Sequence, residues 1–153
     1  MSTRVCSIAS AAILAAAPLS AQVSPPAQPS PAPLSPAEEA RFISLGRTYT
    51  RWFLHSDADS LAGAMDMGTF LKAGGTTQLV ANSQLVSEQA GTERKVLVEK
   101  MTRRKGVLQF WHEAEFTKLE AGDPLVIRWL MDAQGKIVGL GLGLRSGTPA
   151  PDN

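Results

Sequence analysis

The stretch PLVIRWLMDAQGKIVGLGL, residues 124–142, decides the fold. Two apolar runs, 124–131 and 136–144, stand on either side of the turn sequence DAQG, which is typical of a β-hairpin. Two earlier runs, 94–102 and 107–119, are bounded by short connections that contain glycine. The second half of the chain is therefore predicted to be an antiparallel meander of four strands.

The first half has the period of helices. Ser35, Pro36 and Glu38 form a capping box with proline at the first helical position, so a helix is expected to start there. Its core-facing stripe has the spacing of three and four residues that a helix requires. That stripe is Phe42, Leu45, Tyr49, Trp52 and Phe53.

Two further helices are expected. Ser56 and Asp59 repeat the capping pattern and predict a short helix that runs to about Met65. Glycines at 68, 74 and 75 then interrupt the chain, and a helix is predicted from Thr76 to Gln89. Its inward residues are expected to be Leu79, Val80, Leu85 and Val86. Helices followed by an antiparallel sheet make the predicted fold class α+β.

This order of elements, with its closing hairpin at Pro124–Leu142, resembles the cone-shaped, cystatin-like fold shared by nuclear transport factor two, ketosteroid isomerase and SnoaL-type cyclases. The hairpin is similar to the ending of a small secreted bacterial domain of unknown function in that superfamily. The resemblance implies N-terminal helices packed on a curved four-stranded antiparallel sheet. Its motifs are structural, so it implies no catalytic residue.

Residues 1–21 have the pattern of a signal peptide: Arg4, an apolar run from Ile8 to Ala17, and small residues up to Ala21. Cleavage is expected after Ala21, with Ala17 as a second site. The protein is then exported, to the periplasm or the cell exterior, with no stable membrane span after cleavage.

The rest of the chain divides into three predicted parts. Residues 22–36 are a proline-rich disordered linker, 37–147 are a single α+β domain, and 148–153 are a disordered tail.

Composition excludes several classes of function. Cys6, the one cysteine, lies in the signal segment, so the mature chain has no thiol for a disulfide, a zinc site or a nucleophile. Removing Arg4 with that segment takes the formal net charge from +1 to 0, which does not favour nucleic acid as a partner. His55 and His112 lack metal-ligand spacing, and no cofactor motif is present. We expect no metal and no cofactor.

A two-residue turn at Ala121 and Gly122 would place residues whose numbers sum to 243 opposite each other. One sheet face would then be apolar and would line a ligand cavity under the first helix. The expected lining is Tyr49, Trp52, Phe110, His112, Phe116, Trp129 and Met131. Burial would keep His112 neutral, either as a base in the cavity or, alternatively, as a core histidine bonded to a backbone or hydroxyl group.

The opposite face is predicted to be polar apart from Trp111. The same register sets Glu115 against Arg128 as an exposed ion pair, with Glu113 beside them. An exposed tryptophan on such a face favours association, so this face is predicted to form a homodimer.

The sequence therefore favours a non-catalytic exported module that binds a small apolar ligand or a protein. The alternative is a small isomerase, cyclase or hydrolase that uses His112 with Tyr49. A third hypothesis is a domain whose cavity is filled by its own side chains.

Overall fold

The computed structural model describes residues 33–151. Within that range four α-helices precede four strands and a short 3-10 turn, so the predicted α+β class is correct. The elements are α1 Pro36–Leu54, α2 Ala58–Ala64, α3 Met67–Lys72, α4 Gly75–Gln89, β1 Glu93–Arg104, β2 Val107–Phe116, β3 Leu125–Met131, β4 Ile137–Leu144 and η1 Arg145–Gly147. The predicted signal segment, its cleavage site and residues 22–32 of the predicted linker lie outside the described residues.

Side-chain caps explain where the helices begin. The predicted capping box at α1 is confirmed, since the amide of Glu38 donates to Ser35 Oγ and the Glu38 carboxylate accepts from the Ser35 amide. At α2 the cap is Asp57 rather than Ser56. The glycine-interrupted region also forms a helix that we did not predict, because Asp66 caps α3 by accepting from the amide of Thr69.

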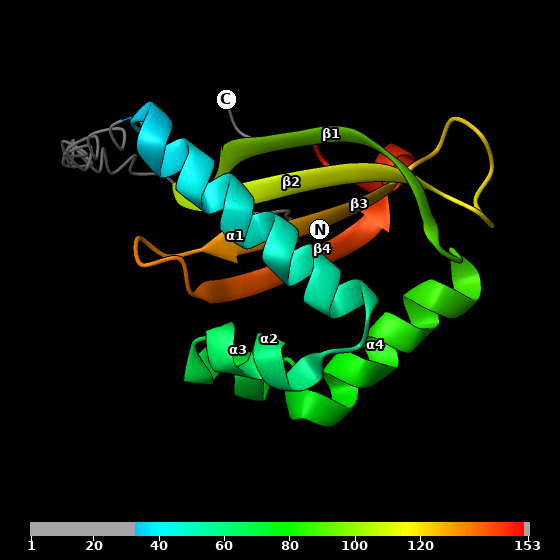
Figure 1. The fold of residues 1–153 in the computed structure, drawn as a ribbon, viewed down its shortest axis with the longest axis horizontal. Coiled ribbons are helices and arrows are strands. Elements are labelled where there is room, and N and C mark those ends of the chain that lie inside the picture. The colour runs from blue at the N-terminus through cyan, green and yellow to red at the C-terminus, as the bar shows by residue number, and fades with distance from the viewer. Residues whose placement is uncertain (1–32, 152–153) are drawn as a thin grey trace, which may run out of the picture.

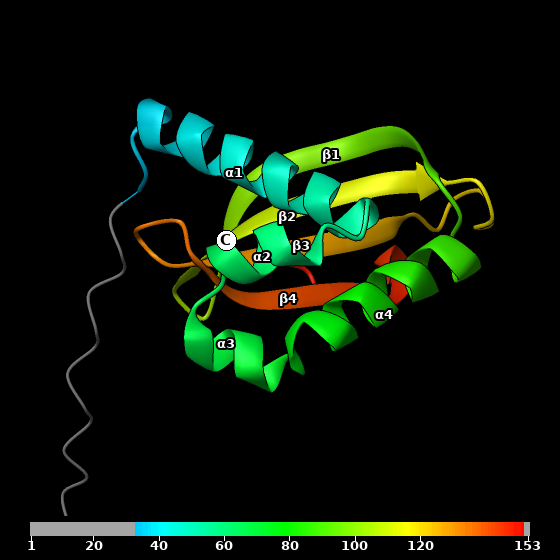
Figure 2. The ribbon, with the colours of Figure 1, turned by 60° about the horizontal axis from the view of Figure 1, so that its bottom comes forward.

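The helices cover one face and one edge of the sheet. In Figure 1 α1 crosses the sheet diagonally, and both views place α3 and α4 along β4, the last strand (Figures 1 and 2). The apolar side of α1 and one face of β2 and β3 form the core. Its fully buried members include Phe53, Phe110, Ile127 and Trp129.

The sheet has the order β1-β2-β3-β4, and all its neighbouring strands are antiparallel. The predicted register between β2 and β3 is wrong by four residues, since Phe110 rather than Ala114 lies opposite Trp129. The cause is an early end of β2 at Phe116, after which the amides of Thr117 and Lys118 donate to Thr92 and Ala90. A shift by an even number keeps every side chain on its predicted face.

Residues 145–151, which we call the C-terminal strap, cross the face of the sheet opposite α1. Arg145 lies over the ring of Trp111 on β2, Thr148 Oγ1 donates to the carbonyl of Leu144, and Pro151 lines a hollow beside β1. Thr148 is buried against the sheet, and the predicted disordered tail from residue 148 stays a prediction.

Candidate functional site

The residues predicted to line a cavity pack against one another instead. Phe110, Trp129 and Met131 are at most 1% exposed, and Trp52 packs against the same cluster. The ring of Tyr49 lies 5.7 Å from that of Trp52 and 5.9 Å from that of Trp129. These side chains fill the space under α1, as the third hypothesis expected.

Tyr49 is held by the turn between β3 and β4. Its hydroxyl donates to the carbonyl oxygen of Gly135 at 2.8 Å. Burial raises the pKa of the Tyr49 phenol, although the charge of Arg41 opposes that effect. The proton therefore stays on the phenol and is donated to the backbone.

His112 is in contact with two carboxylates on β1 rather than with Tyr49. Its Nε2 lies 2.8 Å from Glu93 Oε2, and its Nδ1 lies 3.1 Å from Glu99 Oε1. Glu99 also accepts from Arg47 Nε on α1 at 2.7 Å. Each ring nitrogen must carry a proton to donate to a carboxylate, so the doubly protonated imidazolium fits this geometry.

The geometry around His112 differs from that expected for a neutral imidazole. Desolvation, the largest single effect, lowers the pKa of His112, but the hydrogen bonds and charges of Glu93 and Glu99 together raise it above 6.5. The partners are carboxylates, not the backbone or hydroxyl group expected of a core histidine. His112 thus joins β1 to β2 through a part-buried network with Glu93 and Glu99, and the structure does not bring it into contact with Tyr49.

This network predicts a pH dependence of stability. Since the folded pKa of His112 lies above the unfolded value, its contribution is complete below about pH 6 and is lost as the pH rises through the folded pKa. The contribution amounts to about 1.4 kcal/mol for each unit by which the pKa is raised. Urea unfolding of wild type and His112→Gln from about pH 5 to about pH 9 measures it. A stability difference independent of pH would contradict the charged state of His112.

The sheet face that contains Trp111, which was predicted to bind a partner, has contacts other than those expected. Trp111 is 2% exposed beneath Arg145, and its Nε1 donates to Glu113 at 3.2 Å. Glu115 accepts from Arg94 rather than from Arg128, because Arg128 lies opposite Trp111 in the true register. The exposed tryptophan that motivated a homodimer is thus covered by the protein's own strap, and we do not propose that dimer.

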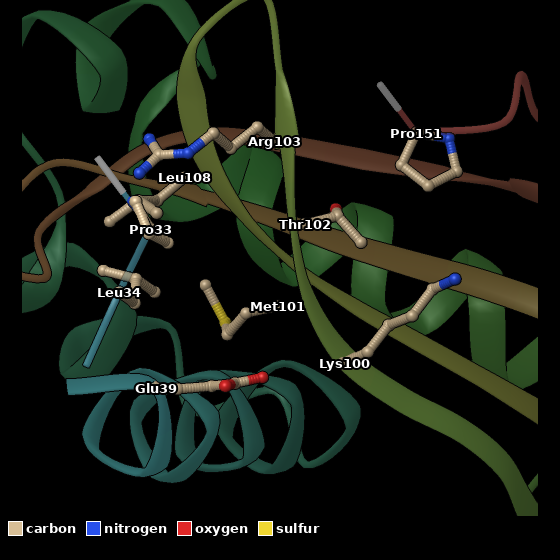
Figure 3. Close-up of a pocket in the computed structure, with 9 residues that line it drawn as sticks. All are labelled: Pro33, Leu34, Glu39, Lys100, Met101, Thr102, Arg103, Leu108 and Pro151. Carbon is tan, nitrogen blue, oxygen red and sulfur yellow. The ribbon is translucent and has the colours of Figure 1, made fainter. Parts of the chain in front are cut away.

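A hollow of about 480 Å³ lies at the edge of β1, between the start of α1 and the strap (Figure 3). Figure 3 shows Glu39 of α1 and Lys100 of β1 at its rim, with Met101 between the two elements. Pro33 and Pro151, the first and last described residues, close it. Its boundary therefore adjoins chain outside the described range.

A second, apolar site lies between β4 and the helices α3 and α4. Two hollows, of about 510 and 310 Å³, share Asn82 and Leu142 as walls and so lie end to end along β4. We call them together the α4–β4 groove. Its lining is Met65, Thr69, Lys72, Ala73, Leu79, Asn82, Leu85, Val86, Gln89, Ala90, Leu119, Leu125 and residues 138–140 and 142–144.

Exposed apolar side chains gather around this groove. Of six large apolar side chains that are exposed within residues 33–151, four lie on α3, α4 and β4: Met67, Leu71, Leu85 and Leu144. We expected Leu85 to face inward, but it is 49% exposed. One feature of the sequence could have indicated this groove. The edge strand IVGLGLGL carries no charge, whereas edge strands normally carry charges that block pairing with other strands.

Comparisons with known proteins do not identify the chain: no family model, curated protein or solved structure matches it. Among residues 33–151 no helix combines the length and the apolar character needed to cross a membrane. In the same range no group of three or more histidine, cysteine, aspartate or glutamate side chains is arranged to hold a metal ion.

Proposed function

We propose that the protein is a non-catalytic module that binds an elongated apolar small molecule in the α4–β4 groove. The observation that carries this proposal is the pair of adjoining hollows along β4, which together extend about 20 Å from Val138 to Leu144 and have mostly leucine, valine, alanine and glycine walls. Its two parts have the volumes of small-molecule sites, and such sites are mostly apolar with few polar groups. The resemblance to the cone-shaped superfamily and the export pattern of residues 1–21 support an exported binding domain of the nuclear-transport-factor-two type.

The charge of the groove suggests the kind of ligand. Of the described residues that line it, Lys72 alone is ionisable, and it lies at the α3 end. A single acyl chain with a carboxylate beside Lys72 would match both the apolar length and the one cation. Asn82 and Gln89 of α4 are uncharged, so neither adds a charge that would compete with Lys72 for the carboxylate.

Displacement of the fluorescent dye anilinonaphthalene sulfonate by lauric acid tests this function. We expect the purified protein to bind both, and we expect Leu85→Glu to weaken lauric acid binding tenfold or more. The reason is that a carboxylate placed in an apolar site costs well over about 1.4 kcal/mol, the equivalent of that factor.

The matched control is Val96→Glu, which adds the same charge at a 42%-exposed apolar position on β1, away from the groove. It should bind as wild type does. Lys72→Gln should weaken lauric acid but leave dodecanol binding unchanged. Equal losses in Leu85→Glu and Val96→Glu, or no displacement by lauric acid, would show that the groove is not the site.

A further inference from the structure

A small polar hollow of about 250 Å³ lies where the last turns of α1 and α4 meet the start of β1. It is separate from the α4–β4 groove, because the two have no lining residue in common. Its polar walls are His55, Ser83, Ser87, Thr92 and Glu93, and its apolar walls include Leu54 and Phe116. We call it the His55–Glu93 hollow. Its volume suits a ligand of only a few heavy atoms.

The walls of this hollow can be reached from solvent. His55, Ser87 and Thr92 are exposed residues, and the side chain of Glu93 is 28% exposed. A solute can therefore contact their polar atoms without a movement of the backbone.

The end of α1 makes His55 a hydrogen-bond acceptor. The helix closes with a Schellman turn, in which Ser56 takes the left-handed conformation. At that turn the carbonyl of Arg51 accepts from His55 twice, from the amide and from Nδ1 at 2.8 Å. A carbonyl can only accept, so Nδ1 carries a proton, and Nε2 of the neutral ring offers a lone pair.

Glu93 supplies the charge of the hollow. Of the described residues that line it, Glu93 alone has a carboxylate, and none is a lysine or an arginine. Its Oε2 lies 2.8 Å from His112 Nε2. Within residues 33–151 Glu93 has this one side-chain hydrogen bond, so Oε1 is left to accept from a ligand.

Two helices end at the hollow. Leu54 is the last residue of α1, and Ser87 lies in the last turn of α4. The C-terminus of a helix carries a partial negative charge, so both ends favour a cation. The ammonium group of Lys118 already donates to the carbonyls of Ser87 and Glu88 on the α4 side. On the α1 side the acceptors of His55 and Glu93 face the hollow without such a lysine.

We infer that the His55–Glu93 hollow binds a small primary ammonium ion. One N–H group would donate to Glu93 Oε1 as a charge-assisted hydrogen bond, and another would donate to the ring of His55. A short alkyl chain on the ammonium group would lie against Leu54 and Phe116. An anion does not match a hollow with acceptor walls and the negative ends of two helices.

Titration of the full chain with n-butylammonium chloride at about pH 8 tests the site, with sodium chloride at equal ionic strength as the reference. We expect the His55 ring signals in a ¹H–¹⁵N spectrum to shift saturably, with a Kd on the order of 1 mM for so small a ligand. The matched ligand n-butanol has the same chain without the charge and should cause no saturable shift.

Binding should also change the titration of His112. Two cations would then share the Glu93 carboxylate, so bound n-butylammonium should lower the pKa of His112. Glu99 and Arg47, the other charged groups of the network, are not walls of the hollow. The His112 ring signals, followed from about pH 5 to about pH 9 with and without the ligand, measure this shift. An unchanged pKa would contradict binding at Glu93.

Glu93→Gln should weaken n-butylammonium binding tenfold or more, because it removes the carboxylate and keeps the size of the side chain. The matched control is Glu88→Gln, which removes an exposed carboxylate from the last turn of α4, outside the hollow. Its Kd should stay within about twofold of wild type. Equal losses in both variants, or no saturable shift in wild type, would overturn the inference. The wild-type comparison of n-butylammonium with n-butanol decides the question even if Glu93→Gln does not fold.

Discussion

Trp129→Ala is expected to lower the free energy of unfolding by about 4 kcal/mol, which is close to the whole stability of many small domains. The indole is 0% exposed, and its ring meets Tyr49 and Phe53 edge to face at 5.9 and 6.0 Å. Its removal leaves a cavity at the point where α1 meets the sheet. Urea unfolding followed by circular dichroism measures the loss.

Trp129→Phe separates packing from hydrogen bonding at the same position. The indole Nε1 donates to Thr50 Oγ1 at 2.9 Å, and phenylalanine retains most of the ring contacts without that bond. We expect a loss of about 1 to 2 kcal/mol. A Trp129→Phe loss as large as that of Trp129→Ala would mean that the hydrogen bond, not the ring packing, holds α1 in place.

Gly46→Ala is expected to destabilise the protein by about 3 kcal/mol, although alanine is normally better than glycine inside a helix by about 1 kcal/mol. The added methyl group would overlap the ring of Phe110. Phe110 is 0% exposed and cannot turn away into solvent, so α1 must move off the sheet. The steric effect therefore outweighs the helix propensity.

Gly63→Ala in α2 is the matched control. A methyl group there meets nothing within 4 Å, so only the helix propensity acts. We expect thermal unfolding to show a stabilisation of about 0.5 to 1 kcal/mol in Gly63→Ala, against the loss in Gly46→Ala. The same sign in both variants would contradict the close packing of α1 on β2.

Local signals predicted the elements of this fold, and non-local contacts decided the rest. The start of α1 was predictable because Ser35 and Glu38 lie three residues apart and cap each other. The β2–β3 register was not, because β2 ends where Thr117 bonds to Thr92, a residue far away in the sequence. The alternation of side chains along each strand still assigned the residues of β2 and β3 to the correct face of the sheet.

The residues of the candidate sites were predictable from the sequence, but their contact partners were not. The sequence identified His112 as inward-facing, but its partners Glu93 and Glu99 depend on strand pairing and on two irregularities of register in β1. Burial of Trp111 was not predictable from alternation either, because a segment beyond the sheet covers it. The apolar groove required the placement of α4 beside β4, which no periodicity specifies.

The strap also imposes an order of events on folding. Trp111 belongs to β2, but the residues that cover it follow β4 in the chain. During synthesis the sheet can assemble while this indole is still in water, and the ring is enclosed only after residue 145 and its successors have emerged. The partly made domain therefore exposes the Trp111 ring to water until the strap has been synthesised.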